Sequence, residues 1–186
     1  MLARGTEWIG FPADGQGFVR RECPRCRRQF KTRGGPEDGA IVQRYLAKHL
    51  QLENCHEVTA DDVLFHCVYC GCGARADEWC TPQQRAWMER VANALRAQMR
   101  FEQLTFAYRT LRDNPGPTFL AVAPPFDLPR LEYEPDDMRR ASFFCCVEDV
   151  KLDARWRRCV YCPRCGAEHQ TSASRYVRLA LEPVDA

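Results

Sequence analysis

The sequence lacks any long apolar run. The longest run near its middle, Phe119 to Ala123, is far too short to span a bilayer. The first residues, Met1 to Trp8, also lack the apolar stretch of a signal peptide. These two absences argue against a membrane protein and against a secreted one, so we expect a cytoplasmic location. In a reducing compartment, clustered thiols usually hold metal rather than form disulfides.

The sequence also lacks the short motifs that mark many enzymes. It has no P-loop, GxGxxG, GxSxG or HExxH motif. It holds only four histidines, and none precedes a PCxxC pair with the HxE spacing of the zinc deaminases. We therefore expect no catalysis, although a cysteine/histidine nucleophile pair stays an alternative in a chain this rich in cysteine.

Cysteine is what the chain has in quantity, with twelve in 186 residues. Six of them form three CxxC pairs beside turn-forming Pro or Gly, and these pairs are Cys23–Cys26, Cys67–Cys70 and Cys162–Cys165. A two-residue spacer lets both sulfurs face one tetrahedral ion, and we call such a turn a knuckle. Two knuckles together make a four-cysteine zinc site.

The first predicted site consists of Cys23, Cys26, Cys67 and Cys70. Residues 18–80 resemble a zinc ribbon in their order of strand, CPxC knuckle, strand and CxxCG knuckle. The resemblance implies a ribbon fold around a structural Zn²⁺ and does not imply a particular function. Cys72 is an alternative to Cys70, and Cys80 lies close enough in sequence to substitute. Cys55 has no partner by spacing, and we expect a small buried residue there.

The second predicted site consists of Cys145, Cys146, Cys162 and Cys165. Residues 142–170 also resemble a zinc ribbon, but an adjacent cysteine pair replaces the first CxxC. Alternative shells combine one of that pair with Cys159, His169 or Glu148, and a further alternative is a site that has lost its metal. With both sites filled, we expect two Zn²⁺ ions per chain.

Two helices are expected between and after the first knuckles. Apolar spacing predicts a helix over 37–52, which fills the long gap between Cys26 and Cys67. A longer helix is expected over 82–112, with Thr81 as N-cap and Gln84 completing a capping box. One apolar face of this helix comprises Trp87, Met88, Val91, Leu95, Met99 and Phe106, while Leu104, Tyr108 and Leu111 fall on the other side. The later turns are thus either buried on two sides or contact another chain.

We expect an α+β fold in which two small zinc-ribbon-like modules flank the long helix. The predicted divisions are an N-terminal ribbon with a helical insertion (1–80), the long helix (81–113), a Pro-rich connector (114–141) and a C-terminal ribbon-like module (142–186). Short strands are expected at 63–65, 118–123 and 176–181, among others. Cys67-Val68-Tyr69-Cys70 recurs as Cys159-Val160-Tyr161-Cys162, which fits two related modules or arises by chance.

Charge is unevenly distributed although the net charge is only +2. Residues 20–33 carry seven basic side chains against Glu22 alone, and residues 113–153 carry nine acidic ones against four basic. The basic segment can contact phosphate, an acidic partner or the chain's own acidic segment. The candidate nucleic-acid-binding residues are Arg25, Arg27, Arg28, Lys31, Arg157 and Arg158, which lie among aromatic residues as single-strand binders require.

These observations favour a non-catalytic adaptor or accessory subunit with a protein partner. The supporting features are the long helix with apolar residues on two faces and the acidic 132–137 stretch. Nucleic-acid binding through the arginine-rich knuckles is the alternative, and a cysteine-dependent enzyme is the third hypothesis. The sequence gives no sign of a small-molecule substrate. Salt-sensitive retention on single-stranded DNA separates the second hypothesis from the first.

Overall fold

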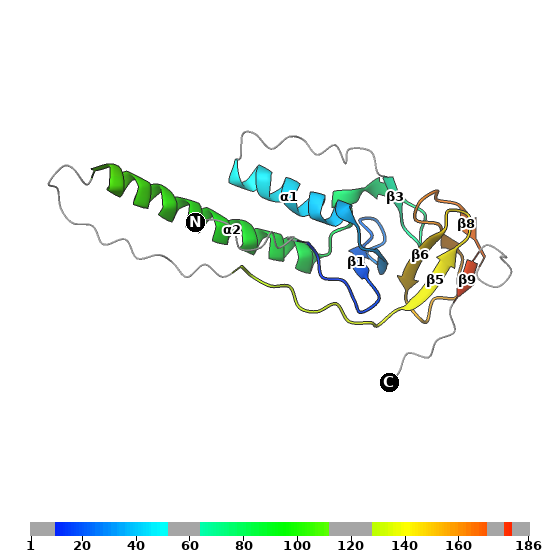
Figure 1. Ribbon diagram of the computed structural model, residues 1–186. Coiled ribbons are helices and arrows are strands. Elements are labelled where there is room, and N and C mark those ends of the chain that lie inside the picture. Colours follow the sequence, from blue (N-terminus) through cyan, green and yellow to red (C-terminus); the bar gives the residue numbers. More distant parts are fainter. Residues whose placement is uncertain (1–9, 52–63, 112–127, 171–176, 180–186) are drawn as a thin grey trace.

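The computed structural model describes residues 10–51, 64–111, 128–170 and 177–179. These residues form an α+β fold, as predicted, in which antiparallel strands gather at one end and the long helix α2 extends away from them (Figure 1). The predicted strand at 118–123, Val63 and Cys55 lie outside the described residues. Within the described ranges, no helix has both the length and the apolar character needed to cross a membrane.

The helices are α1 (Pro36–Leu50) and α2 (Pro82–Leu111), with a 3₁₀ turn at Ala76–Trp79. The strands are β1 (Phe18–Glu22), β2 (Gln29–Arg33), β3 (Leu64–His66), β4 (Gly73–Arg75), β5 (Arg139–Phe143), β6 (Glu148–Leu152), β7 (Val160–Tyr161), β8 (Glu168–His169) and β9 (Val177–Leu179). Five strands make the main sheet in the order β1-β2-β6-β5-β9, and the pairs β3–β4 and β7–β8 make two small hairpins.

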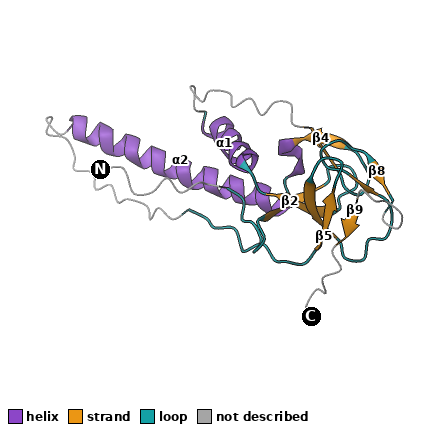
Figure 2. Ribbon diagram, turned by 45° about the vertical axis from the view of Figure 1, so that its right-hand side comes forward, coloured by secondary structure: helices purple, strands orange, loops and turns teal. Residues whose placement is uncertain are grey.

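The main sheet joins the two predicted modules. Hairpin β1–β2 belongs to the N-terminal module and hairpin β5–β6 to the C-terminal one, and β2 pairs with β6 so that Lys31 faces Lys151. The modules flank α2 along the sequence, but in space they lie side by side on one sheet rather than on either side of the helix (Figure 2). Pairing β2 with β6 satisfies backbone groups that two separate ribbons would each leave open at an edge.

The two hairpins of the main sheet are related by an approximate two-fold arrangement. Arg20 pairs with Lys31 as Arg140 pairs with Lys151. Each turn contains one non-glycine residue with positive φ, namely Arg27 at 60° and Val147 at 54°. The interval along the chain is the same from Arg20 to Arg140, from Arg27 to Val147 and from Lys31 to Lys151. In the CxxCG knuckles, the N–H of Cys67 donates to the Cys72 carbonyl as the N–H of Cys162 donates to the Ala167 carbonyl, so the structure matches Cys67 with Cys162 rather than with Cys159.

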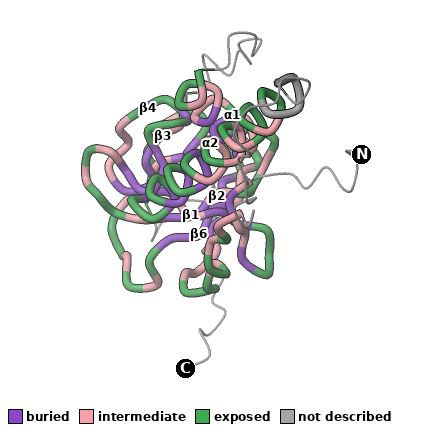
Figure 3. The backbone as a smooth tube through the Cα atoms, turned by 90° about the vertical axis from the view of Figure 1, so that its left-hand side faces the viewer, coloured by how far each residue is buried: buried purple, intermediate pink, exposed green. Residues whose placement is uncertain are grey.

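Helix α2 begins as the capping box predicts. The backbone N–H of Thr81 donates to Oε1 of Gln84 at 2.8 Å, and the N–H of Gln84 donates to Oγ1 of Thr81 at 3.2 Å. The first turns of α2 bury Trp87, Met88 and Val91 against α1, whose buried residues include Val42. This second apolar cluster lies beside the cluster under the sheets, and buried residues gather around β1, β2, β3 and β6 in a view along the molecule (Figure 3).

The later turns of α2 are exposed. Leu104 is 65% exposed and Phe106 is 74% exposed, in contrast to Val91 at 1%. The predicted apolar face is therefore buried only over its first half. The side chains of Tyr108 and Leu111 lie outside the described residues.

A buried charge network ties the connector to the main sheet. Asp14, Lys31 and Lys151 are all buried, and Oδ2 of Asp14 lies 2.8 Å from Nζ of Lys151 and 3.4 Å from Nζ of Lys31. The acidic stretch predicted at 132–137 completes it: Glu134 and Asp137 each lie 3.1 Å from Lys31. The basic segment thus faces the chain's own acidic segment at this point.

Candidate metal centres

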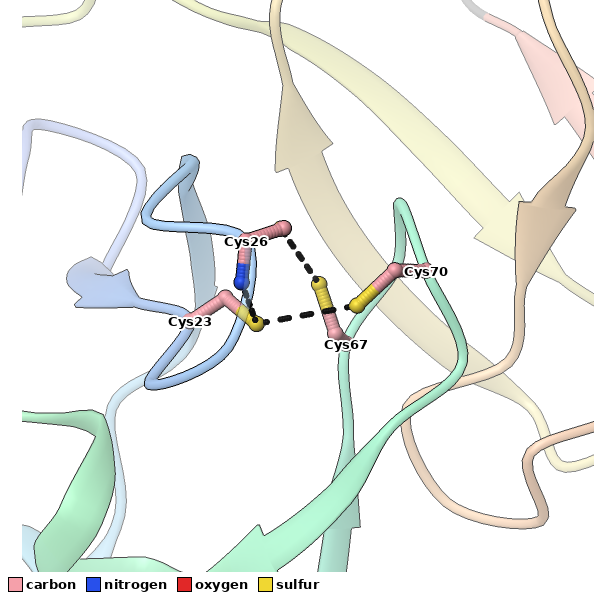
Figure 4. Close-up of side chains that lie close together, drawn as sticks. All are labelled: Cys23, Cys26, Cys67 and Cys70. Atoms are coloured by element: carbon pink, nitrogen blue, oxygen red, sulfur yellow. Dashed lines mark hydrogen bonds between the residues drawn. The ribbon is translucent and has the colours of Figure 1, made fainter.

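The structure brings Cys23, Cys26, Cys67 and Cys70 together, with their sulfurs all within 4.8 Å of one another (Figure 4). The first two lie in the turn between β1 and β2, and the other two follow β3. Sulfur–sulfur distances across the knuckles are 3.7 Å for Cys23–Cys70 and 3.7 Å for Cys26–Cys67. Four sulfurs at this spacing can hold one metal ion.

Backbone hydrogen bonds set the shape of both knuckles. In the first, the N–H of Arg27 donates to the carbonyl of Cys23 at 3.0 Å, and the N–H of Cys26 donates to the Cys23 sulfur at 3.3 Å. In the second, the N–H of Gly71 donates to the carbonyl of Cys67 at 2.9 Å. Gly71 has φ of 68°, a conformation that glycine adopts without strain, and this explains why the sequence places glycine there.

Cys72 and Cys80, the two alternative ligands of the first site, lie in different surroundings. The Cys72 sulfur lies 3.3 Å from that of Cys23, so a fifth thiol borders the first quartet. Cys80 instead is buried in the cluster between α1 and α2, and burial raises the pKa of its thiol to about 11. The expectation that Cys80 can substitute at the site is therefore wrong, because the 3₁₀ turn carries it to the other apolar cluster.

Burial and hydrogen bonding shift the pKa values of the thiols in the first site in opposite directions. Burial raises the pKa of Cys67 strongly, since its sulfur has little access to water. Burial also opposes ionisation of Cys23, but hydrogen bonds from the Cys26 N–H and from Cys72 lower the pKa of Cys23 to about 7. Several thiolates so close together repel one another, and a bound cation removes that repulsion. The donor set therefore fits a metal ion.

The second quartet also assembles as predicted: the sulfurs of Cys145, Cys146, Cys162 and Cys165 all lie within 4.8 Å of one another. Cys162 is buried, while Cys145 and Cys165 are exposed. The adjacent pair fits because the two hairpins share their register: Glu22 pairs with Gln29 as Ser142 pairs with Asp149. In that shared register, Cys146 corresponds to Cys26, and Cys145 stands where the first turn has Arg25.

Of the alternative ligands, His169 lies at the edge of the second quartet. Its Nε2 atom lies 3.5 Å from the Cys145 sulfur. Glu148 instead accepts a hydrogen bond from Arg164 at 3.2 Å, and the Cys159 carbonyl accepts one from the Trp156 indole at 3.0 Å. The position of His169 suits an outer hydrogen bond to a ligating sulfur, a role that orients the ligand.

The two sites are joined by reciprocal backbone hydrogen bonds. The N–H of His66, just before Cys67, donates to the carbonyl of Pro163 at 2.8 Å. The N–H of Tyr161, just before Cys162, donates to the carbonyl of Val68 at 3.0 Å. Each CxxCG knuckle is thus held by the strand that enters the other. Sequence reasoning missed this contact, because nothing local in either strand specifies a partner some hundred residues away.

The candidate nucleic-acid residues separate into two groups. Lys31 is fully buried and contacts Asp14, Glu134 and Asp137, and it also donates to the Pro135 carbonyl. Its assignment to a nucleic-acid surface is therefore wrong, because a buried cation needs its carboxylates. The remaining residues, Arg25, Arg27, Arg28, Arg157 and Arg158, are all exposed.

Tyr69 is a joining residue that sequence reasoning did not single out. Its hydroxyl donates to the Gln29 carbonyl at 2.9 Å and accepts from the Asp153 N–H at 2.9 Å, so it connects both modules. Its place inside a CxxC knuckle was the only signal of this role in the sequence.

Comparisons of the chain with protein-family models, with curated proteins and with solved structures found no match.

Proposed function

We propose that this chain is a non-catalytic, zinc-stabilised interaction protein that acts as an adaptor or accessory subunit. Zinc suits both quartets, because four thiolates in tetrahedral arrangement are its usual structural shell and leave no position for water or substrate. When bound, the ion supplies folding energy rather than chemistry. Each sulfur that ligates the ion is also unavailable as a nucleophile.

The observation that carries the proposal is the exposed distal half of α2. Leu104 and Phe106 are two large apolar residues, 65% and 74% exposed, on a helix that extends beyond the sheets (Figure 1). Phe106 also makes an interaction within the chain, but its side chain and that of Leu104 stay largely exposed, and two such side chains on one projecting helix favour a docking element. The proximal half anchors it, since Trp87 and Val91 are buried.

Helical geometry defines the kind of partner that fits. Residues 104 and 106 are two positions apart and so point to different sides of the helix. Phe106 continues the stripe of Val91, Leu95 and Met99, whereas Leu104 starts a second one. We expect a partner protein that covers both sides, such as a helical hairpin that completes a bundle with α2.

Site-specific photo-crosslinking tests this function. A benzophenone amino acid is placed at Leu104 or Phe106, with Glu89 on the exposed proximal part of α2 as the matched control. The proposal requires one protein that crosslinks at 104 and 106 but not at 89. Binding of that purified protein must then fall at least tenfold with Leu104→Glu and not with Glu89→Gln.

Two results contradict this proposal. Equal crosslinking at positions 89 and 104 means that the distal half is not a docking element. A crosslinked species containing two copies of this chain, with a matching dimer in sedimentation, identifies self-association and removes the need for a separate partner. Metal content reports on the fold independently of either result.

A further inference from the structure

The tertiary structure joins two arginine clusters that are far apart in sequence. Arg28, from the turn of the first module, places its guanidinium carbon 4.7 Å from the ring centroid of Trp156 in the second module. Arg155, Arg157 and Arg158 are the chain neighbours of that tryptophan, and all are exposed. Arg139 also reaches the site, donating to the Trp156 carbonyl at 2.5 Å. We call these five arginines around Trp156 the Trp156 surface.

Trp156 is fixed in place and so can organise this surface. Its indole N–H donates to the Cys159 carbonyl at 3.0 Å, and its ring meets Tyr69 edge-on at a centroid distance of 4.9 Å. Arg157 is fixed as well, donating to the carbonyls of Ala154 at 2.5 Å and Trp156 at 3.1 Å. The planar guanidinium of Arg28, held on the rigid Trp156 ring, loses little conformational freedom when it binds a ligand.

Two exposed arginines of the Trp156 surface, Arg155 and Arg158, carry charge that no described carboxylate pairs with. Within the described part of the chain, the side chains of Arg155 and Arg158 make no ion pair. Arg20, by contrast, lies 2.7 Å from Glu134 and 2.6 Å from Asp137. Burial first, and then the charge of Arg157, lowers the pKa of Arg139. The chain thus neutralises Arg20 in the main sheet and leaves Arg155 and Arg158 for an external anion.

We propose that the Trp156 surface binds single-stranded nucleic acid. Arg155, Arg157 and Arg158 contact successive phosphates, and a base stacks on the Arg28 guanidinium, which Trp156 supports from behind. Neither described helix carries these residues, so the surface has no helix to enter a duplex groove. None of its arginines belongs to α2, so this proposal is independent of the docking element proposed above.

Fluorescence anisotropy with a labelled 15-nucleotide single strand of mixed sequence tests this proposal. We expect the variant Arg155→Ala/Arg157→Ala/Arg158→Ala to lower the slope of log affinity against log salt by about 2, at roughly 0.7 per lost phosphate contact. The control variant Arg85→Ala/Arg90→Ala/Arg100→Ala removes three exposed charges from α2 and should leave the slope unchanged. Unchanged circular dichroism and metal content must accompany both variants.

Arg28→Lys separates stacking from charge. Lysine keeps the charge but cannot stack, so we expect the affinity to fall about fivefold or more with no change in the salt slope. Absence of binding by the wild type at 50 mM salt overturns the proposal, as do equal losses in the two triple variants. If poly-glutamate of matched charge or a duplex competes as well as the single strand, the surface recognises charge alone and the proposal fails.

Discussion

The imidazole of His66 lies directly over Gly166 of the opposite knuckle. A Cβ atom on Gly166 would come within 2.8 Å of Cδ2 of His66. The reciprocal contact is present too, since a Cβ on Gly71 would come within 2.8 Å of Cδ1 of Tyr161. Because His66 and Tyr161 immediately precede Cys67 and Cys162, each metal site is packed against the strand that leads into the other.

Alanine at Gly71 or Gly166 should therefore destabilise both knuckles. Both glycines have positive φ, so alanine costs about 1–2 kcal/mol in backbone strain alone. The clash with an aromatic ring adds about 1–3 kcal/mol for an overpacked contact. Gly17 also has positive φ but open space around it, so Gly17→Ala reports the strain term by itself. Thermal unfolding of the three alanine variants measures the loss of stability. Equal losses for Gly17→Ala, Gly71→Ala and Gly166→Ala would show that the ring contacts contribute nothing.

Loss of one metal site should weaken the other. We expect two metal ions per chain for the wild type and one for Cys162→Ser, with weaker retention of the remaining ion, because the knuckle at 162–166 supports His66. Elemental analysis of protein purified without added zinc gives the content, and competition with a coloured chelator gives the affinity. An unchanged affinity of the first site in Cys162→Ser would refute the coupling, and two ions in that variant would refute the second site.

The first site should depend on Cys70 and not on Cys72. The four sulfurs that lie within 4.8 Å of one another include Cys70, so Cys70→Ser should release the first metal under chelator competition. Cys72 is adjacent to Cys23 but outside that quartet, so we expect Cys72→Ser to retain both metals. The opposite pattern in metal content would show that Cys72 is the ligand.

Asp14→Asn should destabilise the fold by about 3 kcal/mol, since it leaves buried lysines without their shared carboxylate. Burial raises the pKa of Asp14, but hydrogen bonds from Lys151 and from the Phe18 and Gln16 N–H groups outweigh it and lower the pKa overall. A lowered pKa means that this stabilisation is complete above the ordinary value of 3.8 and is lost as the pH falls through the folded-state value.

Urea denaturation at pH 7 measures the stability that Asp14→Asn removes. Asp136→Asn is the matched control, because Asp136 contacts the same Lys151 at 2.5 Å from a partly exposed position. We expect that control to cost about 1 kcal/mol or less. Equal effects of the two substitutions would contradict a special role for the buried carboxylate.

The sequence by itself determined the local features of this protein. CxxC spacing beside Pro and Gly identified six of the eight sulfurs in the two quartets, since a knuckle is a property of a few consecutive residues. Apolar periodicity and the Thr81–Gln84 capping box identified α2 and its start for the same reason. Even the adjacent pair Cys145-Cys146 was recognisable, because its place before Cys162 repeats the order of the first ribbon.

Only the tertiary structure decided how these parts meet. The pairing of β2 with β6, the reciprocal contacts of His66 and Tyr161, and the burial of Lys31 all join residues far apart in sequence, and no local pattern encodes such pairings. Cys80 is a further residue whose surroundings the sequence did not predict. Its spacing suited a metal ligand, but the chain after the 3₁₀ turn places it in the apolar cluster with α1. Local chemistry fixed which groups can bind metal, whereas long-range packing fixed which arginines are neutralised and which, around Trp156, are left exposed.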